Sequence, residues 1–298
     1  MSTLVEGEAS SSTPTMATSS MANLLDSLDQ ARVIHYSPQA LSAALQQLRT
    51  NLDRGSTSQY LVVRGVNETI FNRIDNGYRG VRLTWYSDVE TLIIKVPTEA
   101  HDQAAASFGG YVDHTARNMG VANIERRVVG TATYHAVLPA RTVSKQPDWG
   151  MKPQNLRPHG RFPTIVLEVG FSETLTQLRK DARLWFAMSN EVQIVILIAI
   201  RAAKNNIIFE KWAMAPTLAN QPVTRNAPAQ VPQCEQSITI TRTPQANNTY
   251  TLAITAGMAP LTLEFNKLFL RQPVGGEQDI DFTQADLFDV AQSAFDNC

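Results

Sequence analysis

Two carboxylates near the middle of the chain have the types and setting for joint chemistry. Asp148 follows Pro147 in the segment QPD, and Glu168 lies inside the apolar segment FPTIVLEVGF. An ionised Glu in such a segment needs a partner, because removing a carboxylate from water is costly. On neighbouring strands, the two carboxylates would converge and repel each other. A divalent cation such as Mg²⁺ removes that conflict, and its bound water suits phosphodiester hydrolysis.

Simpler interpretations stand beside this one. Asp148 fits an ordinary turn, since Asp is common after proline in turns. Trp149, its neighbour, could stack on a nucleic-acid base or pack into the core. The five histidines of the chain lack the short paired spacing of a zinc site.

The elements around the carboxylates alternate between helix and strand patterns. Ala104, Phe108 and Tyr111 share one face of a helix that starts at Thr98, although Gly109 weakens it. FPTIVLEVGF reads as a strand covered on both faces, and so does VQIVILIAI. The expected order is helix, three strands, helix, strand, over residues 98–120, 122–135, 137–148, 162–171, 172–190 and 192–200.

This arrangement resembles the PD-(D/E)XK nuclease superfamily, and within it the restriction-endonuclease-like branch of bacteria and fungi. The matching residues are Pro147-Asp148, Glu168-Val169, Ser172 with Lys180, and EVQIVILI. The resemblance spans roughly residues 98–200. It implies an α/β (α+β) restriction-endonuclease-like αβββαβ core with a mixed central sheet. It also implies a nuclease that depends on Mg²⁺ (or Mn²⁺) and acts on DNA.

One departure concerns the superfamily's usual lysine, whose place two residues after Glu168 is taken by Gly170. A cation there would position and stabilise the attacking water. In the resembling branch the basic residue moves to the next helix, which implies Lys180, with Arg179 and Arg183 as substitutes. Lys180 also fits the solvated face of that helix.

The resemblance therefore implies Asp148, Glu168 and Lys180 as catalytic residues, and Asp148, Glu168 and Asp102 as metal ligands. Asp102 equally fits the preference for acids in the first turn of a helix.

The expected nucleic-acid contacts are basic side chains near the carboxylates. The formal net charge is −1, so phosphate binding would need a local patch rather than an overall field. Such residues suit phosphate contacts, although solvated loop charge explains them as well. The candidates are Lys145, Lys152, Arg157, Arg161, Arg179 and Arg183.

Composition shifts divide the chain into four parts. The Ser/Thr-rich residues 1–22 predict a disordered tail. Residues 23–97 predict an N-terminal lobe with a helix after Ser37 and three strands. The resemblance implies a nuclease-like core at residues 98–200, and the strand patterns of residues 201–298 predict a β-rich extension with a terminal helix.

An intracellular protein, cytoplasmic or nuclear, is the expected class. The N-terminus lacks a secretory signal pattern, and the longest apolar run, residues 192–200, is too short to span a membrane. Cys234 and Cys298 do not suggest a disulfide scaffold. The sequence leaves the oligomeric state open.

Three functions remain compatible with the sequence. The first is a metal-dependent nuclease. The second is a catalytically inactive module of the same fold that binds nucleic acid or protein, for which Gly170 is the best argument. The third is a purely structural interaction module.

Overall fold

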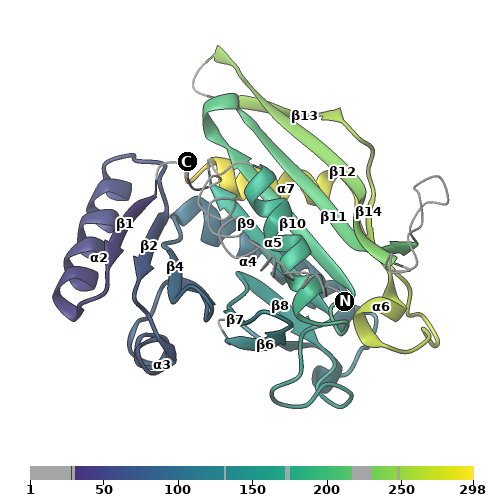
Figure 1. The fold of residues 1–298 in the computed structure, drawn as a ribbon. Helices are drawn as coiled ribbons and strands as arrows, with labels where there is room; N and C mark the ends of the chain where they lie inside the picture. The colour runs from purple at the N-terminus through teal and green to yellow at the C-terminus, as the bar shows by residue number, and fades with distance from the viewer. Residues whose placement is uncertain (1–27, 29–30, 131, 172–174, 217–229, 247–248) are drawn as a thin grey trace, which may run out of the picture.

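The computed structural model of the protein describes residues 28, 31–130, 132–171, 175–216, 230–246 and 249–298 (Figure 1). This part of the chain forms a mixed α/β protein with six α-helices and two large mixed sheets. The predicted tail at residues 1–22 and the predicted helix cap Ser172 lie outside the described residues.

The first large sheet has six strands in the order β1-β2-β4-β3-β7-β6. The strands are β1 (Arg32–His35), β2 (Tyr60–Arg64), β3 (Arg82–Tyr86), β4 (Thr91–Lys95), β6 (Tyr134–Leu138) and β7 (Arg141–Lys145). β1 runs parallel to β2, and the other neighbours are antiparallel.

Two helices pack against this sheet. The predicted helix after Ser37 is confirmed as α2 (Pro38–Asp53), with the Ser37 side chain accepting a hydrogen bond from the Ala40 backbone N–H. The second helix, α3 (Glu68–Gly77), is capped by Asn67 and was not predicted. Both helices bury their apolar faces with one face of the sheet in a common hydrophobic cluster.

The second large sheet has seven strands in the order β13-β12-β11-β10-β9-β8-β5. They are β5 (Arg127–Val128), β8 (Trp149–Lys152), β9 (Ile165–Phe171), β10 (Ile194–Arg201), β11 (Asn206–Pro216), β12 (Gln230–Pro244) and β13 (Tyr250–Ala256). β9 and β10 are parallel and are connected through α5 (Leu175–Met188), as a parallel pair requires a crossover. Their side chains are almost all buried, as predicted from their apolar sequences.

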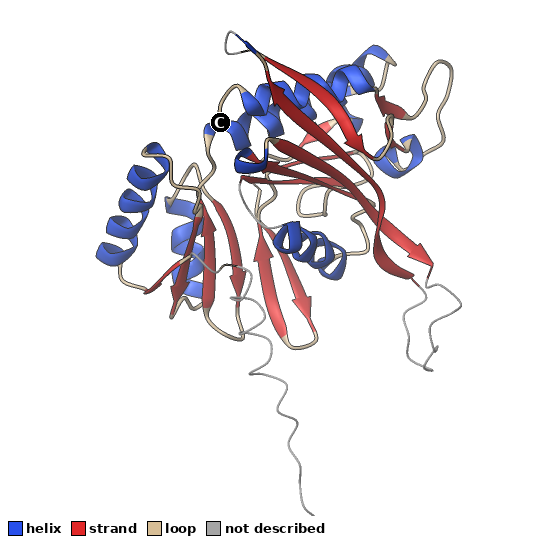
Figure 2. Ribbon diagram, turned by 90° about the horizontal axis from the view of Figure 1, so that it is seen from above, coloured by secondary structure: helices blue, strands red, loops and turns tan. Residues whose placement is uncertain are grey.

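Helices cover both faces of this second sheet. On one face, α4 (Glu99–Asn118) and the predicted terminal helix, α7 (Gln284–Phe295), share its larger hydrophobic cluster. On the other face, α5 packs in a cluster that also contains side chains of the six-stranded sheet. Figure 2 shows a helix between the two sets of strands, and the two sheets therefore meet around α5.

The predicted αβββαβ core is not confirmed as one unit. β6 and β7 join the six-stranded sheet through the pairing of β7 with β3, whereas β8 pairs with β9. The chain crosses from one sheet to the other between Lys145 and Trp149, and Asp148 lies in this crossing. β11, β12 and β13 continue the sheet of β9 and β10 rather than forming a separate one.

Two local details differ from the sequence prediction. Gly109, expected to weaken the helix, lies within α4 without interrupting it, and its missing side chain leaves room for the indole of Trp149, which an added Cβ would overlap. The segment PLTLEFNKLFL is only partly a strand: β14 (Leu261–Leu263) pairs with β15 (Ile280–Phe282), and α6 (Phe265–Phe269) follows. Phe265, Leu268 and Phe269 are buried at helical spacing, which explains the change.

Among the described helices, none combines the length and the apolar character needed to cross a membrane.

Candidate functional site

Asp148 and Glu168 lie side by side at the junction of the two sheets. Trp149 is the register partner of Leu167, so Asp148 and Glu168 occupy the next pair of positions. The Asp148 backbone N–H donates a hydrogen bond to the Leu167 carbonyl at 3.2 Å. Both carboxylates are buried. The crossing between the sheets therefore places the two acids next to each other.

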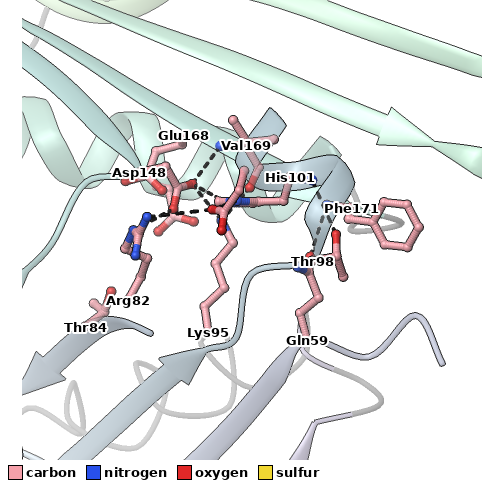
Figure 3. Close-up of polar contacts among 12 residues, drawn as sticks. Gln59, Arg82, Thr84, Lys95, Thr98, His101, Asp148, Glu168, Val169 and Phe171 are labelled. Atoms are coloured by element: carbon pink, nitrogen blue, oxygen red, sulfur yellow. Dashed lines mark hydrogen bonds and ion pairs between the residues drawn. The ribbon is translucent and has the colours of Figure 1, made fainter. Parts of the chain in front are cut away.

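The Asp148 carboxylate is surrounded by nitrogen atoms from three other elements and from β9 (Figure 3). Its Oδ2 lies 2.8 Å from Lys95 Nζ and 3.0 Å from His101 Nε2. The Val169 backbone N–H donates to the same oxygen at 2.8 Å. Its Oδ1 lies 3.4 Å from Arg82 Nε. Asp148 thus joins β3, β4 and α4 to the seven-stranded sheet.

Lys95 was not selected from the sequence, yet it makes a central contact here. It is the last residue of β4 in the six-stranded sheet, and its ammonium donates to both Asp148 Oδ2 and the Val169 carbonyl. Gly170, which stands where the superfamily has its usual lysine, follows Val169 directly. The signal was a lysine closing the apolar segment TLIIK, which raises the same question as Glu168 in its strand.

The Glu168 carboxylate has a different set of partners. Its Oε1 accepts a hydrogen bond from Trp185 Nε1 at 2.6 Å and lies 3.2 Å from Lys145 Nζ. Lys145 also contacts Asp181 Oδ1 at 3.0 Å, which ties Glu168 to α5. A cavity of about 20 Å³ opens beside this group, and its charged lining is Arg82, Lys95, Lys145, Glu168 and Asp181. Such a cavity is large enough for one water molecule.

These environments shift the two pKa values in opposite directions. Burial opposes ionisation of Asp148, but the charges of His101 and Lys95 hold its pKa well below the usual range. Burial raises the pKa of Glu168 to about 7, because the lowering by Lys145 is smaller and the Asp148 charge adds to the increase. Burial lowers the pKa of His101, but Asp148 and Asp102 together raise it above its usual value. Near neutral pH, Asp148 is ionised and Glu168 can take up or release a proton.

The residues at this site do not fit a Mg²⁺ ion as they are arranged. Asp148 Oδ2 already contacts the Lys95 ammonium and the His101 ring, and Glu168 Oε1 contacts Lys145. In the described part of the chain, no group of three or more His, Cys, Asp or Glu side chains is placed to hold a metal ion. The side-chain cations neutralise the carboxylates in its place.

The other two predicted site residues lie at the margin of this network. Asp102 contacts His101 Nδ1 at 3.1 Å and Arg82 Nη2 at 3.9 Å, but its side chain is 60% exposed. Asp102 therefore reaches Asp148 only through these two residues. Lys180 is half-buried on α5 and does not line the cavity beside Glu168. Its catalytic role stays a prediction.

Most of the predicted phosphate-binding side chains have partners within the protein. Lys145 and Lys152 are buried, and Lys152 donates to the carbonyls of Pro158 and Arg161. The others contact acids or an aromatic ring: Arg157 and Arg161 pair with Glu191, Arg179 pairs with Glu210, and Arg183 lies over the Trp212 ring. The acids that pair with these arginines are distant in sequence. The sequence alone therefore could not show that these basic residues are paired within the protein rather than available to bind phosphate. Trp149 packs against Phe108 in the core.

No protein-family model matches this chain, and no curated protein matches it either. A proposal of function for this chain therefore rests on the geometry of the site and on the resemblance seen in its sequence.

Proposed function

We propose that the protein hydrolyses phosphodiester bonds of DNA, with Glu168 as the base and side-chain cations as the electrostatic partners. The position of the Lys95 ammonium carries this proposal. It lies 2.8 Å from Asp148 and contacts the Val169 carbonyl, which precedes Gly170. Lys95 thus supplies from another sheet the cation that is missing at Gly170. DNA as the substrate rests on the resemblance seen in the sequence.

The chemistry follows from the charges around the cavity. Glu168, with a pKa of about 7, is suited to accept the proton of a water molecule as the water oxygen bonds to phosphorus. The bond from phosphorus to the leaving ester oxygen breaks, and that oxygen takes a proton from solvent. Lys95, Lys145 and Arg82 would stabilise the negative charge that develops on the phosphoryl oxygens. Asp148 stays ionised and holds Lys95 in place.

A cleavage assay with two glutamate variants tests the proposal. Supercoiled plasmid DNA and labelled single-stranded DNA and RNA would be incubated with the protein in EDTA, in Mg²⁺ and in Mn²⁺. We expect cleavage in EDTA, and we expect Glu168→Gln to lower its rate by about 10²–10⁴-fold. Glu210→Gln is the matched control, because Glu210 is also a buried glutamate of the same sheet. Loss of cleavage in both variants, or cleavage by neither variant nor wild type, would contradict the assignment.

A second pair of variants asks which lysine acts. Lys95→Met should lower the rate in EDTA more than Lys180→Met, because Lys95 contacts Asp148 directly. The two rates would be compared with protein folding monitored by circular dichroism. A larger loss in Lys180→Met would instead show that Lys180 on α5 is the catalytic lysine, as the resemblance implies.

The enclosure of the site favours a second candidate, a non-catalytic module of the same fold. The side chains of Asp148 and Glu168 are 0% and 3% exposed, and the cavity holds only about 20 Å³. In this alternative the ion pairs hold the two sheets together, and the protein binds nucleic acid or another protein without cleaving it. Gel-shift binding of DNA by wild type, without cleavage in any of the three buffers, would favour this alternative.

A further inference from the structure

The Lys95 ammonium occupies a position that combines two oxygen atoms of the kind hard cations prefer. One is Asp148 Oδ2, at 2.8 Å, and the other is the Val169 carbonyl oxygen. Carboxylates and backbone carbonyls are ligands for Mg²⁺, Mn²⁺ and Ca²⁺. Glu168, the residue before Val169, provides the neighbouring carboxylate. The Lys95 ammonium thus contacts two oxygen atoms of the kind that bind divalent cations, and it takes the place that such a cation would have between them.

With Glu168 ionised, the charges on the elements packed around this position are balanced. Arg82, Lys95 and Lys145 face three carboxylates, Asp148, Glu168 and Asp181. His101 and the exposed Asp102 form a further pair at the edge. A divalent ion would add two positive charges to a buried group in which opposite charges are matched. That arrangement is unfavourable, because charge interactions are strong where water is excluded.

We propose that Lys95 is a built-in cation that keeps divalent metal ions out of this site, and that replacing it with a neutral residue creates a metal site at Asp148 and the Val169 carbonyl. Lys95 is well placed for this role. It extends from the last position of β4 in the six-stranded sheet, and its ammonium contacts the Asp148 carboxylate and the Val169 carbonyl of the other sheet.

Metal binding to wild type and two variants tests this inference. Free Mn²⁺ would be measured by electron paramagnetic resonance during titration of wild type, Lys95→Met and Lys95→Met/Asp148→Asn. We expect no saturable Mn²⁺ site that depends on Asp148 in wild type. Lys95→Met should bind one equivalent of Mn²⁺, at least about a hundredfold more tightly than any residual binding of Mn²⁺ to wild type, since one adjacent positive charge is removed. The double variant should lose this binding. Lys204→Met, which removes an exposed lysine, is the matched control and should resemble wild type.

Two results would overturn the inference. The first is a Mn²⁺ site in wild type that disappears in Asp148→Asn. The second is a folded Lys95→Met protein that gains no site. If Lys95→Met does not fold, the comparison of wild type with Asp148→Asn still decides whether the native site admits metal, and Lys95→Arg, which keeps the charge, should exclude Mn²⁺ as wild type does.

This inference concerns the residues of the proposed hydrolysis but does not depend on their activity. Failure to cleave DNA or RNA in any buffer would refute the proposed function, but the Mn²⁺ titration would still test the role of Lys95. Cleavage that requires Mg²⁺ together with an Asp148-dependent Mn²⁺ site in wild type would refute both.

Discussion

Glu168 and Glu210 are two buried glutamates on the same face of the seven-stranded sheet, and they differ in how their oxygens are used. Each is a register partner of Leu197, on opposite sides of β10. Each accepts a hydrogen bond from an indole N–H, Trp185 for Glu168 at 2.6 Å and Trp212 for Glu210 at 2.9 Å. Each also contacts one cationic side chain.

The difference lies in the second carboxylate oxygen. Arg179 donates to both oxygens of Glu210, at 2.5 Å and 3.1 Å, in the two-pronged geometry that suits a guanidinium. The contacts of Glu168 within the described residues all end on Oε1, and the residue lines the cavity. An acid inside an apolar strand is therefore not in itself a sign of chemistry. A site is indicated when part of the carboxylate stays available to a small molecule.

Removing the cation from Glu210 should produce the largest effect in this comparison. Arg179→Ala leaves Glu210 buried without its guanidinium, which costs about 3–5 kcal/mol for a fully buried pair. Because the Arg179 side chain is 41% exposed, we expect a smaller loss of unfolding free energy, about 2–3 kcal/mol. Urea unfolding measures it.

The double variant Arg179→Ala/Glu210→Gln is the control for this mechanism and should recover most of the lost stability, because no buried charge remains unpaired. Equal stability of the single and double variants would show that the loss comes from the packing of Arg179 rather than from its charge.

Periodicity and turn residues were sufficient to predict much of the fold. Ser37 and the leucines after it predicted α2, and the continuous apolar segments predicted β9 and β10 as buried strands. Which sheet a strand joins was not predictable. β7 pairs with β3, a strand more than fifty positions earlier, and neither strand sequence contains a feature that specifies this pairing. α3 was missed because it has only ten residues, fewer than the stretch over which a helical period is usually read, although Asn67 and the spacing of Ile70, Phe71 and Ile74 carried its signal.

For the candidate site, the sequence likewise predicted some residues but not how they are brought together. Asp148 and Glu168 stood out because a carboxylate beside or inside an apolar strand must be compensated. The compensating groups could not be assigned, since Lys95 and Arg82 come from the other sheet and depend on how the two sheets meet. Lys95 and Glu210 are also charged residues of apolar strands, so the sequence marked them in the same way as Glu168. Such a pattern identifies buried charged groups, and only their partners in the structure show what each group does.

The pH dependence of stability should reveal the shifted pKa of the Glu168 carboxyl group. Burial raises the pKa of Glu168 from 4.5 to about 7, so the folded protein binds a proton more tightly than the unfolded chain does. The resulting stabilisation of the folded protein is fully present below about pH 4.5 and is lost as the pH rises through about 7. Relative to Glu168→Gln, wild type should therefore become less stable between pH 5 and pH 8, as measured by thermal unfolding.

Other groups do not obscure this difference. The pKa of Asp148 is lowered, so its contribution is present above its usual range and is lost only in stronger acid. His101 also titrates, but it is retained in both proteins and largely cancels from the comparison. A Glu168→Gln protein with the same pH dependence as wild type would show that another group titrates in this range.

The smallest expected effect comes from the two indole donors. Trp185 Nε1 donates to Glu168 Oε1 and favours the ionised form, so Trp185→Phe should raise the pKa of Glu168 further. One hydrogen bond to a charged group corresponds to about one pH unit. The stability transition near pH 7, and the rise of hydrolysis with pH, should shift upward by about that amount. Trp212→Phe removes the equivalent bond from Glu210 and should shift neither. Equal shifts in both variants would mean that the loss of the larger ring, rather than of its N–H, changes the site, and the distinction between the two glutamates would then rest on the second oxygen alone.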